Sequence, residues 1–277
     1  MKLIQSRDNP LFKELVKLSG SARQRNKSGQ TLLDGAHLLA AYLDSGNRPR
    51  HIMLNGAALH DGEIAGLLER IAEVHVTQLD DKLFAELSEL KTPTGILALI
   101  DLPQPAIGQS RFALLLEDIQ DPGNLGSMLR SAAAAGCDAV FLSMGCADVW
   151  SPKVLRAAMG GHFVLRIYER QDLLGVAKAF SGTLLATSLH AAHSLYDCDL
   201  RGNVAFLIGN EGAGLSADLL GQATQKITIP MPGQVDSLNA AAATAICLFE
   251  TVRQRVGPRP DVHKVHINSL TCKPISL

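Results

Sequence analysis

The sequence predicts an α/β protein of two domains, and three observations support this fold class. Short apolar runs alternate with longer amphipathic segments along most of the chain, which is typical of strands alternating with helices. Residues 103–111, rich in proline and glycine, interrupt the alternation and predict a linker. The 277 residues, of which 47% are hydrophobic, suffice for two cores. We therefore expect a smaller α/β domain at 1–102 and a second domain, with a mainly parallel sheet, at 112–256.

The first domain begins with a helix. Asn9 and Pro10 are typical of an N-cap and a first helical turn, and we expect this helix to run through Leu18. Residues 19–30 are polar and basic, which predicts a mobile segment. Beyond them the hydrophobic pattern predicts strands at 31–33, 51–54, 74–77 and 96–100, and helices at 36–43, 63–73 and 80–87.

The second domain repeats the alternation with more apolar strands. We expect strands at 112–116, 139–142, 164–167, 184–187, 204–208 and 226–229, with helices between them. A long Ala-rich helix is expected at 238–255. The tail, residues 257–277, shows no clear period, and we expect it to be disordered or loosely attached.

The composition argues against several classes of protein. No run approaches the roughly 20 apolar residues of a membrane span, and the N-terminus lacks the apolar stretch of a signal peptide, so we expect a cytoplasmic location and no membrane partner. The five cysteines never form a C-x-x-C pair, which argues against a disulfide framework and a zinc site. His162, His190 and His193 lack a third partner at ligand spacing, so we expect no bound metal.

The first 27 residues are basic although the net charge of the chain is -1. They carry seven Lys or Arg side chains against two acidic ones. Arg23, Arg25 and Lys27 are candidates to bind RNA phosphate. A solvated basic arm explains the same pattern, and both interpretations remain open.

Three polar loops, each following a predicted strand, form the candidate site. They are residues 121–126, leading to Arg130, residues 209–214, and residues 230–233 followed by Ser237, Leu238 and Asn239. In an open α/β sheet the loops at the carboxyl ends of the strands share one crevice. Taken singly, each loop is also explained by a tight turn or a helix cap, with Asn124 and Ser237 as the expected N-caps. Three loops at one sheet edge favour a composite site.

The familiar nucleotide-binding motifs are missing. The chain has neither G-x-G-x-x-G after the first strand of the domain nor G-x-x-x-x-G-K-[ST], and no acidic residue ends the second strand at Leu142. An ordinary dehydrogenase, ATPase or Rossmann methyltransferase is therefore disfavoured.

The motifs resemble those of a known family. Asn124-x-Gly126-x-x-x-Arg130, residues 208–216, and residues 229–231 with 237–239 resemble the three ordered motifs of the SpoU/TrmH RNA ribose 2'-O-methyltransferases of the SPOUT superfamily. The N-terminal half, including residues 91–96, resembles the ribosomal-protein-like substrate-binding domain of many members. The resemblance implies a trefoil knot, S-adenosylmethionine as the methyl donor, an RNA substrate and a homodimer.

The resemblance also implies roles for individual residues. Family proposals give the removal of the hydroxyl proton to Arg130, whereas a guanidinium stays protonated near neutral pH, which leads us to expect an anchor for phosphate and for alkoxide charge. Lys153 and Arg156, one helical turn apart, are candidates for RNA contact or ordinary surface charge. The implied catalytic residues are Asn124, Arg130, Glu211, Ser237 and Asn239, and the implied cofactor-binding residues are Thr187, Gly209, Ile229, Met231 and Leu238.

The expected activity is methyl transfer to a ribose 2'-hydroxyl. A separate RNA-recognition domain favours ribosomal RNA over tRNA, by analogy at the level of the fold. Two alternatives remain: a noncatalytic RNA-binding protein on the same scaffold, and a SPOUT enzyme that methylates a base.

Overall fold

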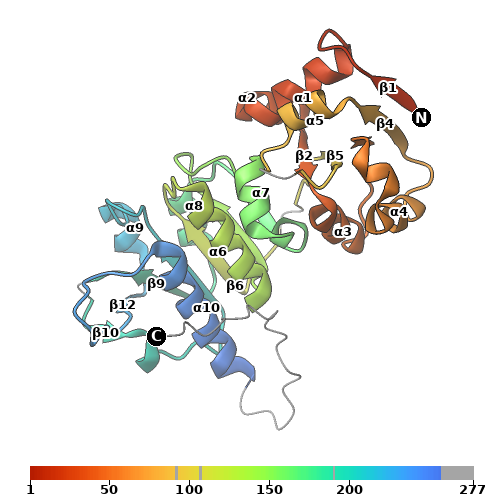
Figure 1. Cartoon of the computed structure of the whole chain (residues 1–277). Coiled ribbons are helices and arrows are strands. Elements are labelled where there is room, and N and C mark those ends of the chain that lie inside the picture. Colours follow the sequence, from red (N-terminus) through yellow and green to blue (C-terminus); the bar gives the residue numbers. More distant parts are fainter. Residues whose placement is uncertain (91–92, 106–107, 190, 257–277) are drawn as a thin grey trace, which may run out of the picture.

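The computed structural model describes residues 1–90, 93–105, 108–189 and 191–256, and within them two α/β units follow one another along the chain (Figure 1). A five-stranded mixed sheet lies in the first unit and a seven-stranded parallel sheet in the second. The predicted fold class is therefore confirmed.

The N-terminal sheet has the strand order β1-β4-β3-β5-β2. Strands β1, β4 and β3 are parallel to one another, and β5 is antiparallel to both of its neighbours. The hydrophobic pattern did not predict β1, the edge strand that pairs with β4. The strands are β1 (Lys2–Ile4), β2 (Gln30–Asp34), β3 (His51–Leu54), β4 (His75–Leu79) and β5 (Ile96–Asp101), and the helices are α1 (Pro10–Gly20), α2 (Ala22–Ser28), α3 (Ala36–Asp44), α4 (Gly62–Glu69) and α5 (Asp81–Leu87), with a 3₁₀ turn, η1, at Ala57–His60.

The prediction of a mobile segment at residues 19–30 was wrong, because this segment contains helix α2. Ser21 caps the helix by accepting a hydrogen bond from the Gln24 N–H. The Arg25 side chain is buried and donates hydrogen bonds to the carbonyl oxygens of Leu18 and Ser19, which holds α2 against the end of α1.

The C-terminal sheet is parallel throughout, with the order β10-β12-β9-β11-β6-β7-β8. Its strands are β6 (Phe112–Leu116), β7 (Ala139–Leu142), β8 (Arg166–Tyr168), β9 (Thr183–Thr187), β10 (His193–Ser194), β11 (Val204–Ile208) and β12 (Gln225–Thr228). Its helices are α6 (Pro122–Ala135), α7 (Pro152–Ala158), α8 (Leu173–Ala179), α9 (Ala217–Gln222) and α10 (Ala240–Val256), with 3₁₀ turns η2 (Gly161–Phe163) and η3 (Leu195–Asp197).

Helices cover both faces of this sheet, which explains why its central strands are apolar at every position. Ala113 and Leu115 of β6 join a core with residues of α8 and α9, while Leu114 and Leu116 join a core with residues of α6, α7 and α10. Side chains of a strand alternate between its faces, so a strand covered on both sides has no polar positions. All five residues of β6 are buried.

Two predicted helix caps are displaced, and both corrections matter for the site. Asp121, not Asn124, caps α6, because its carboxylate accepts the Asn124 N–H at 2.7 Å. Helix α10 begins at Ala240, and Asn239 rather than Ser237 accepts the N–H groups of its first turn. The amide of Asn124 is therefore available for other contacts.

The tail, residues 257–277, lies outside the described residues. The trefoil knot stays a prediction. Across the described ranges, none of the helices combines the length and the apolar character that crossing a bilayer requires.

His162 makes the stability of this fold depend on pH. The side chain is 2% exposed, its Nε2–H donates to the Val149 carbonyl oxygen at 2.7 Å, and Nδ1 has no partner. Burial lowers the pKa of His162 to about 4. An unfolded histidine titrates near 6.5. As the pH falls below this value, His162 becomes protonated in the unfolded chain but stays neutral in the folded chain, which stabilises the unfolded state. The fold should lose about 2 kcal/mol through this group between pH 7 and pH 5.

Urea unfolding of the wild-type protein and of His162→Gln at these two pH values measures the stability that is lost through His162. Glutamine keeps a donor for Val149 but does not titrate, so the variant should lose less stability than the wild type. An equal loss in both proteins would show that His162 is not the group responsible.

Candidate active site

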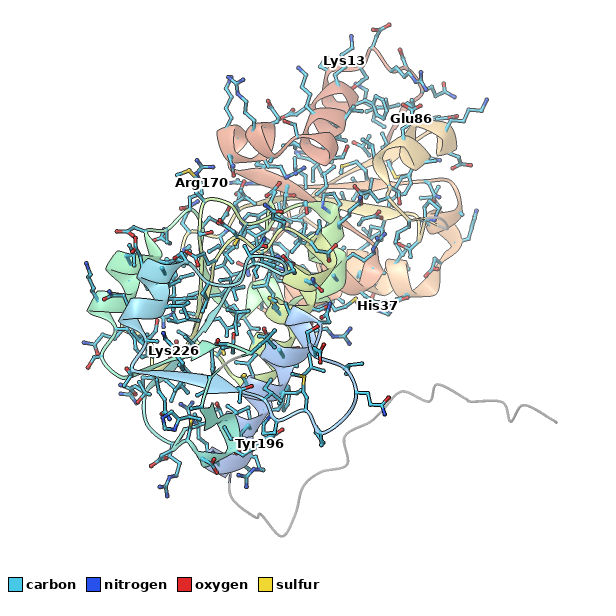
Figure 2. All side chains as sticks on the ribbon, turned by 90° about the vertical axis from the view of Figure 1, so that its left-hand side faces the viewer. Lys13, His37, Glu86, Arg170, Tyr196 and Lys226 are labelled. Carbon is cyan, nitrogen blue, oxygen red and sulfur yellow. The ribbon has the colours of Figure 1, made fainter. Side chains whose placement is uncertain are left out.

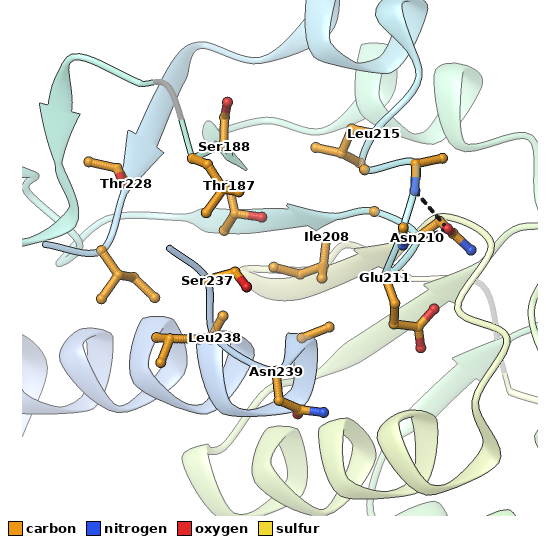
Figure 3. A pocket seen from close by; sticks show the side chains of 18 of the residues that line it. Thr187, Ser188, Ile208, Asn210, Glu211, Leu215, Thr228, Ser237, Leu238 and Asn239 are labelled. Atoms are coloured by element: carbon orange, nitrogen blue, oxygen red, sulfur yellow. Dashed lines mark hydrogen bonds between the residues drawn. The ribbon is translucent and has the colours of Figure 1, made fainter. Parts of the chain in front are cut away.

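The three predicted loops meet at one cavity of about 600 Å³ at the carboxyl ends of β9, β11 and β12 (Figure 3). Its walls combine apolar side chains with the backbone of a glycine-rich loop. The lining includes Asn124, Thr187, Ser188, Leu189, residues 208–215, residues 227–229, Met231 and residues 237–240. Glu211 is the only residue of 210–215 among the predicted site residues. Ser188, Leu189 and the other residues of 210–215 were not predicted, although residues 210–214 belong to the loop that the glycines mark.

The glycine-rich loop after β11 folds back on itself. Asn210 and Gly214 exchange backbone hydrogen bonds of 3.1 and 2.9 Å, and the Asn210 side chain accepts the Gly212 N–H at 2.9 Å. A Cβ on Gly209 would overlap the backbone of Gly214 and Leu215, and Gly214 itself has a positive φ of 71°. Only glycine permits this close approach of two backbone segments.

A chain of side-chain hydrogen bonds joins all three loops. The Glu211 carboxylate accepts the Asn124 amide N–H at 3.0 Å and the backbone N–H groups of Gln120 and Asp121, each at 3.4 Å. The Asn124 amide oxygen in turn accepts from Asn239 at 2.8 Å. Glu211, Asn124 and Asn239, each from a different motif, therefore hold one another on the wall of the cavity.

The charge of Glu211 follows from these contacts. Its partial burial alone would raise the pKa of the carboxyl, but the hydrogen bonds from Asn124 and from the backbone N–H groups outweigh this and hold the pKa below its usual value. Glu211 is therefore ionised at neutral pH, which fixes Asn124 with its N–H toward Glu211 and its oxygen toward Asn239.

An acidic pair after β6 supports the same loops. The Glu117 carboxylate accepts both the backbone N–H and the hydroxyl of Ser216 at 2.7 Å. The carbonyl oxygen of Asp118 accepts from the Asn210 side chain at 2.8 Å, and Asp118 has a positive φ of 54°. The sequence shows this pair directly after a strand, but the partners are far along the chain and only the structure reveals them.

Arg130 lies outside the lining of the cavity. It is exposed on α6, six residues after Asn124, which places it about 9 Å further along the helix and on a different face. Its side chain makes no hydrogen bond or ion pair with the residues that the structure describes. A single copy of the chain therefore brings together four of the five predicted catalytic residues and all five predicted cofactor-binding residues.

Comparison with known proteins places this arrangement in a family. Residues 111–249 match the SpoU rRNA Methylase family, and residues 9–98 match the MRM3-like substrate binding domain. The chain belongs to the SpoU rRNA Methylase family. The resemblance predicted from the three motifs is thus confirmed.

Several known methyltransferases match this SpoU family chain over nearly its whole length. The 23S rRNA (guanosine(2553)-2'-O)-methyltransferase RlmP of Bacillus subtilis is 33% identical over 251 residues, which cover 90% of this chain and 98% of the relative. The SpoU methyltransferase AviRb of Streptomyces viridochromogenes, solved in complex with AdoMet, has a TM-score of 0.79 and 29% identity over 91% of this chain and 100% of its own. An AdoMet-bound rRNA methyltransferase from Sinorhizobium meliloti has a TM-score of 0.78 and 26% identity over 91% and 97%.

The predicted RNA-binding residues of this SpoU family protein fall into two groups. Arg23, Lys27 and Lys153 are exposed, and so is Arg156, whose guanidinium lies 3.4 Å from the Glu89 carbonyl oxygen. Arg25 is a correction: it is 4% exposed and forms an ion pair with Asp148. A guanidinium that is buried and paired inside the protein has no free surface for RNA phosphate.

The described residues of this SpoU family chain show no candidate metal site. Its described residues contain no group of three or more His, Cys, Asp or Glu side chains placed to hold a metal ion. His162 is buried in the core, His193 is exposed in β10, and His190 lies outside the described residues.

Proposed function

We propose that this protein transfers a methyl group from S-adenosylmethionine to a ribose 2'-hydroxyl of ribosomal RNA. The observation that carries the proposal is the hydrogen-bonded chain Glu211–Asn124–Asn239, which ties the three family motifs together on the wall of one cavity. The similarity to a 23S rRNA 2'-O-methyltransferase over 90% of the chain supports both the reaction and the class of RNA.

The cavity fits S-adenosylmethionine in size and chemistry. A volume of about 600 Å³ lies within the range of small-molecule sites, and its lining combines apolar side chains with exposed backbone. Gly209 lets the loop backbone close tightly on Gly214 and Leu215, which shapes the wall that would hold the cofactor. We assign the cofactor to Thr187, Gly209, Ile229, Met231 and Leu238, all of which line the cavity. When bound, S-adenosylmethionine supplies a methyl group on a positively charged sulfur.

The residues of the chain orient the ribose and stabilise the charge that develops on its oxygen. Asn124, held by ionised Glu211, and Asn239, which donates to Asn124, present fixed amide groups to the cavity, and Ser237 adds a hydroxyl. Arg130 anchors phosphate and the developing alkoxide, because a guanidinium cannot act as a base near neutral pH. The hydroxyl proton then passes to a phosphate oxygen of the RNA. Positioning of this kind is worth roughly 7–11 kcal/mol in well-oriented reactions.

A second copy of the chain completes the site in this proposal. Arg130 is exposed and lies outside the cavity of its own copy, and α10, which packs against α6, exposes Phe249 to the extent of 47%. A homodimer formed through these helices would cover the apolar side chain and bring Arg130 to the edge of a shared site. The cytoplasmic location stays a prediction, since some relatives are mitochondrial.

The substrate RNA is proposed to lie across both units. Arg23 and Lys27 on α2 and Lys153 and Arg156 on α7 are exposed cations, and such side chains contact phosphates without reading sequence.

Incubation with methyl-labelled S-adenosylmethionine and, separately, with purified ribosomal RNA and tRNA tests the proposal. We expect label in ribosomal RNA. Label confined to tRNA would change the substrate class, and no transfer to either RNA, with RNA binding retained, would favour the noncatalytic RNA-binding protein.

A further inference from the structure

The two units are joined by a buried polar junction in addition to the linker. The Arg25 side chain of α2 donates to the Asp148 carboxylate, with Nε at 2.8 Å from Oδ2, and the other carboxylate oxygen accepts the Trp150 N–H at 3.1 Å. Thr31 of β2 is fully buried and donates its hydroxyl to the Trp150 carbonyl oxygen at 2.9 Å. Asp148 and Trp150 belong to the C-terminal unit, so these contacts cross from one unit to the other.

Close apolar packing surrounds this junction. The rings of Tyr42 on α3 and Phe163 on η2 meet edge to face, with centroids 5.1 Å apart. A Cβ on Gly160 would lie 2.6 Å from the Cβ of Ala41 on α3. The buried residues of β2 and α3 form one continuous hydrophobic cluster with those of α6 and α7, and side chains fill the region between Arg170 and His37 in Figure 2.

The surface that contacts the N-terminal unit packs closely against α6, the helix that carries Asn124. A Cβ on Gly126 of α6 would lie 2.8 Å from the Val154 carbonyl oxygen of α7, and one on Gly161 of η2 would lie 3.0 Å from the Leu129 carbonyl oxygen of α6. Helices α6 and α7 lie side by side in Figure 1. The N-terminal unit is thus separated from α6, which carries Asn124, by one closely packed layer.

The junction restricts the motion of the two units more than a linker alone would. Domains joined by a short segment move relative to one another unless their interface is large and apolar. A buried arginine is costly unless it is paired and hydrogen-bonded, and Arg25 has partners on both units. The junction therefore holds the N-terminal unit in one orientation on the catalytic unit.

We infer that this rigid junction determines which ribose is methylated, because it fixes the distance between RNA held by the N-terminal unit and the cavity. Arg25, Asp148 and Thr31 are positioning residues in this scheme, and none of them lines the cavity. The inference rests on the proposed function, since it concerns how that substrate is placed.

Two variants disturb the junction by different means. Arg25→Gln removes the charge that pairs with Asp148, and Gly160→Ala drives a methyl group into Ala41 of α3. Matched controls are Arg201→Gln, which removes an exposed ion pair with Asp199, and Gly46→Ala, which has a similar positive φ of 83° but open space at the Cβ position. Thr31→Val, nearly isosteric, removes one junction hydrogen bond and serves if the stronger variants fail to fold.

Each protein is compared with the wild type in three measurements: affinity for S-adenosylmethionine, arrangement of the units by small-angle X-ray scattering, and rate and position of methylation on ribosomal RNA. The junction variants should bind S-adenosylmethionine as the wild type does. At saturating RNA they should methylate the normal nucleotide roughly 10- to 100-fold more slowly, or spread methyl groups to neighbouring nucleotides. Both controls should match the wild type.

Junction variants with an altered scattering profile but the normal rate at the normal nucleotide would overturn the inference and leave the proposed function intact. Unchanged scattering in all junction variants would also overturn it, since the contacts would then not hold the units. Failure of the wild-type protein to methylate any RNA would refute the proposed function itself.

Discussion

Arg130→Ala is expected to reduce methyl transfer by at least about 100-fold and to leave S-adenosylmethionine binding nearly unchanged. The guanidinium is exposed, has no partner among the described residues and lies outside the cavity lining. Its removal therefore costs the cofactor pocket no contact, whereas in the proposed reaction the charge that develops on the ribose oxygen loses its stabilising cation. Single-turnover methylation of ribosomal RNA and calorimetric titration of the cofactor separate the two effects.

Ser127→Ala is the matched control for this variant. Ser127 is exposed on the same helix three residues before Arg130, and alanine is the better helix former, so the control should retain full activity. A parallel loss of cofactor affinity in Arg130→Ala would contradict the assigned role and indicate a structural one.

Gly209→Ala is expected to weaken S-adenosylmethionine binding by at least about 100-fold, or about 3 kcal/mol. The added methyl group would overlap the backbone of Gly214 and Leu215, and backbone cannot rotate away as a flexible side chain can. The loop would have to open, and the wall of the cavity would change shape. Titration of the cofactor into the folded variant measures the loss.

Gly212→Ala in the same loop tests whether this effect is specific. A Cβ there would lie 3.6 Å from the Asn210 side-chain oxygen, an ordinary contact, so binding should change little. Equal losses in both variants would show that any substitution disturbs the loop, and normal binding by Gly209→Ala would place the cofactor elsewhere.

The alternation of the second unit and the order of its motifs could be predicted because they are local properties of the sequence. Apolar runs such as residues 112–116 and 204–208 are short, and glycine-rich turns follow them, so both strands and loops were located correctly. The convergence of the loops followed from the parallel arrangement of the strands.

The corrections concern side chains whose partners are distant in sequence. Arg25 looks like any basic surface residue, because Asp148 is 123 residues away. Asn124 and Asp121 are both good caps, and only the structure shows that Asp121 caps α6 while Asn124 bonds to Glu211 and Asn239. Arg130 lies outside the cavity of its own copy, and none of the residues that the structure describes bonds to its side chain.

The most direct test of the central claim is the chemical position of the transferred methyl group. Ribosomal RNA labelled by the protein is hydrolysed with alkali, which needs a free 2'-hydroxyl to cleave the neighbouring phosphodiester. We predict that the label appears in alkali-resistant dinucleotides and that Arg130→Ala yields almost none. Label recovered in mononucleotides would mean methylation of a base and would contradict the account.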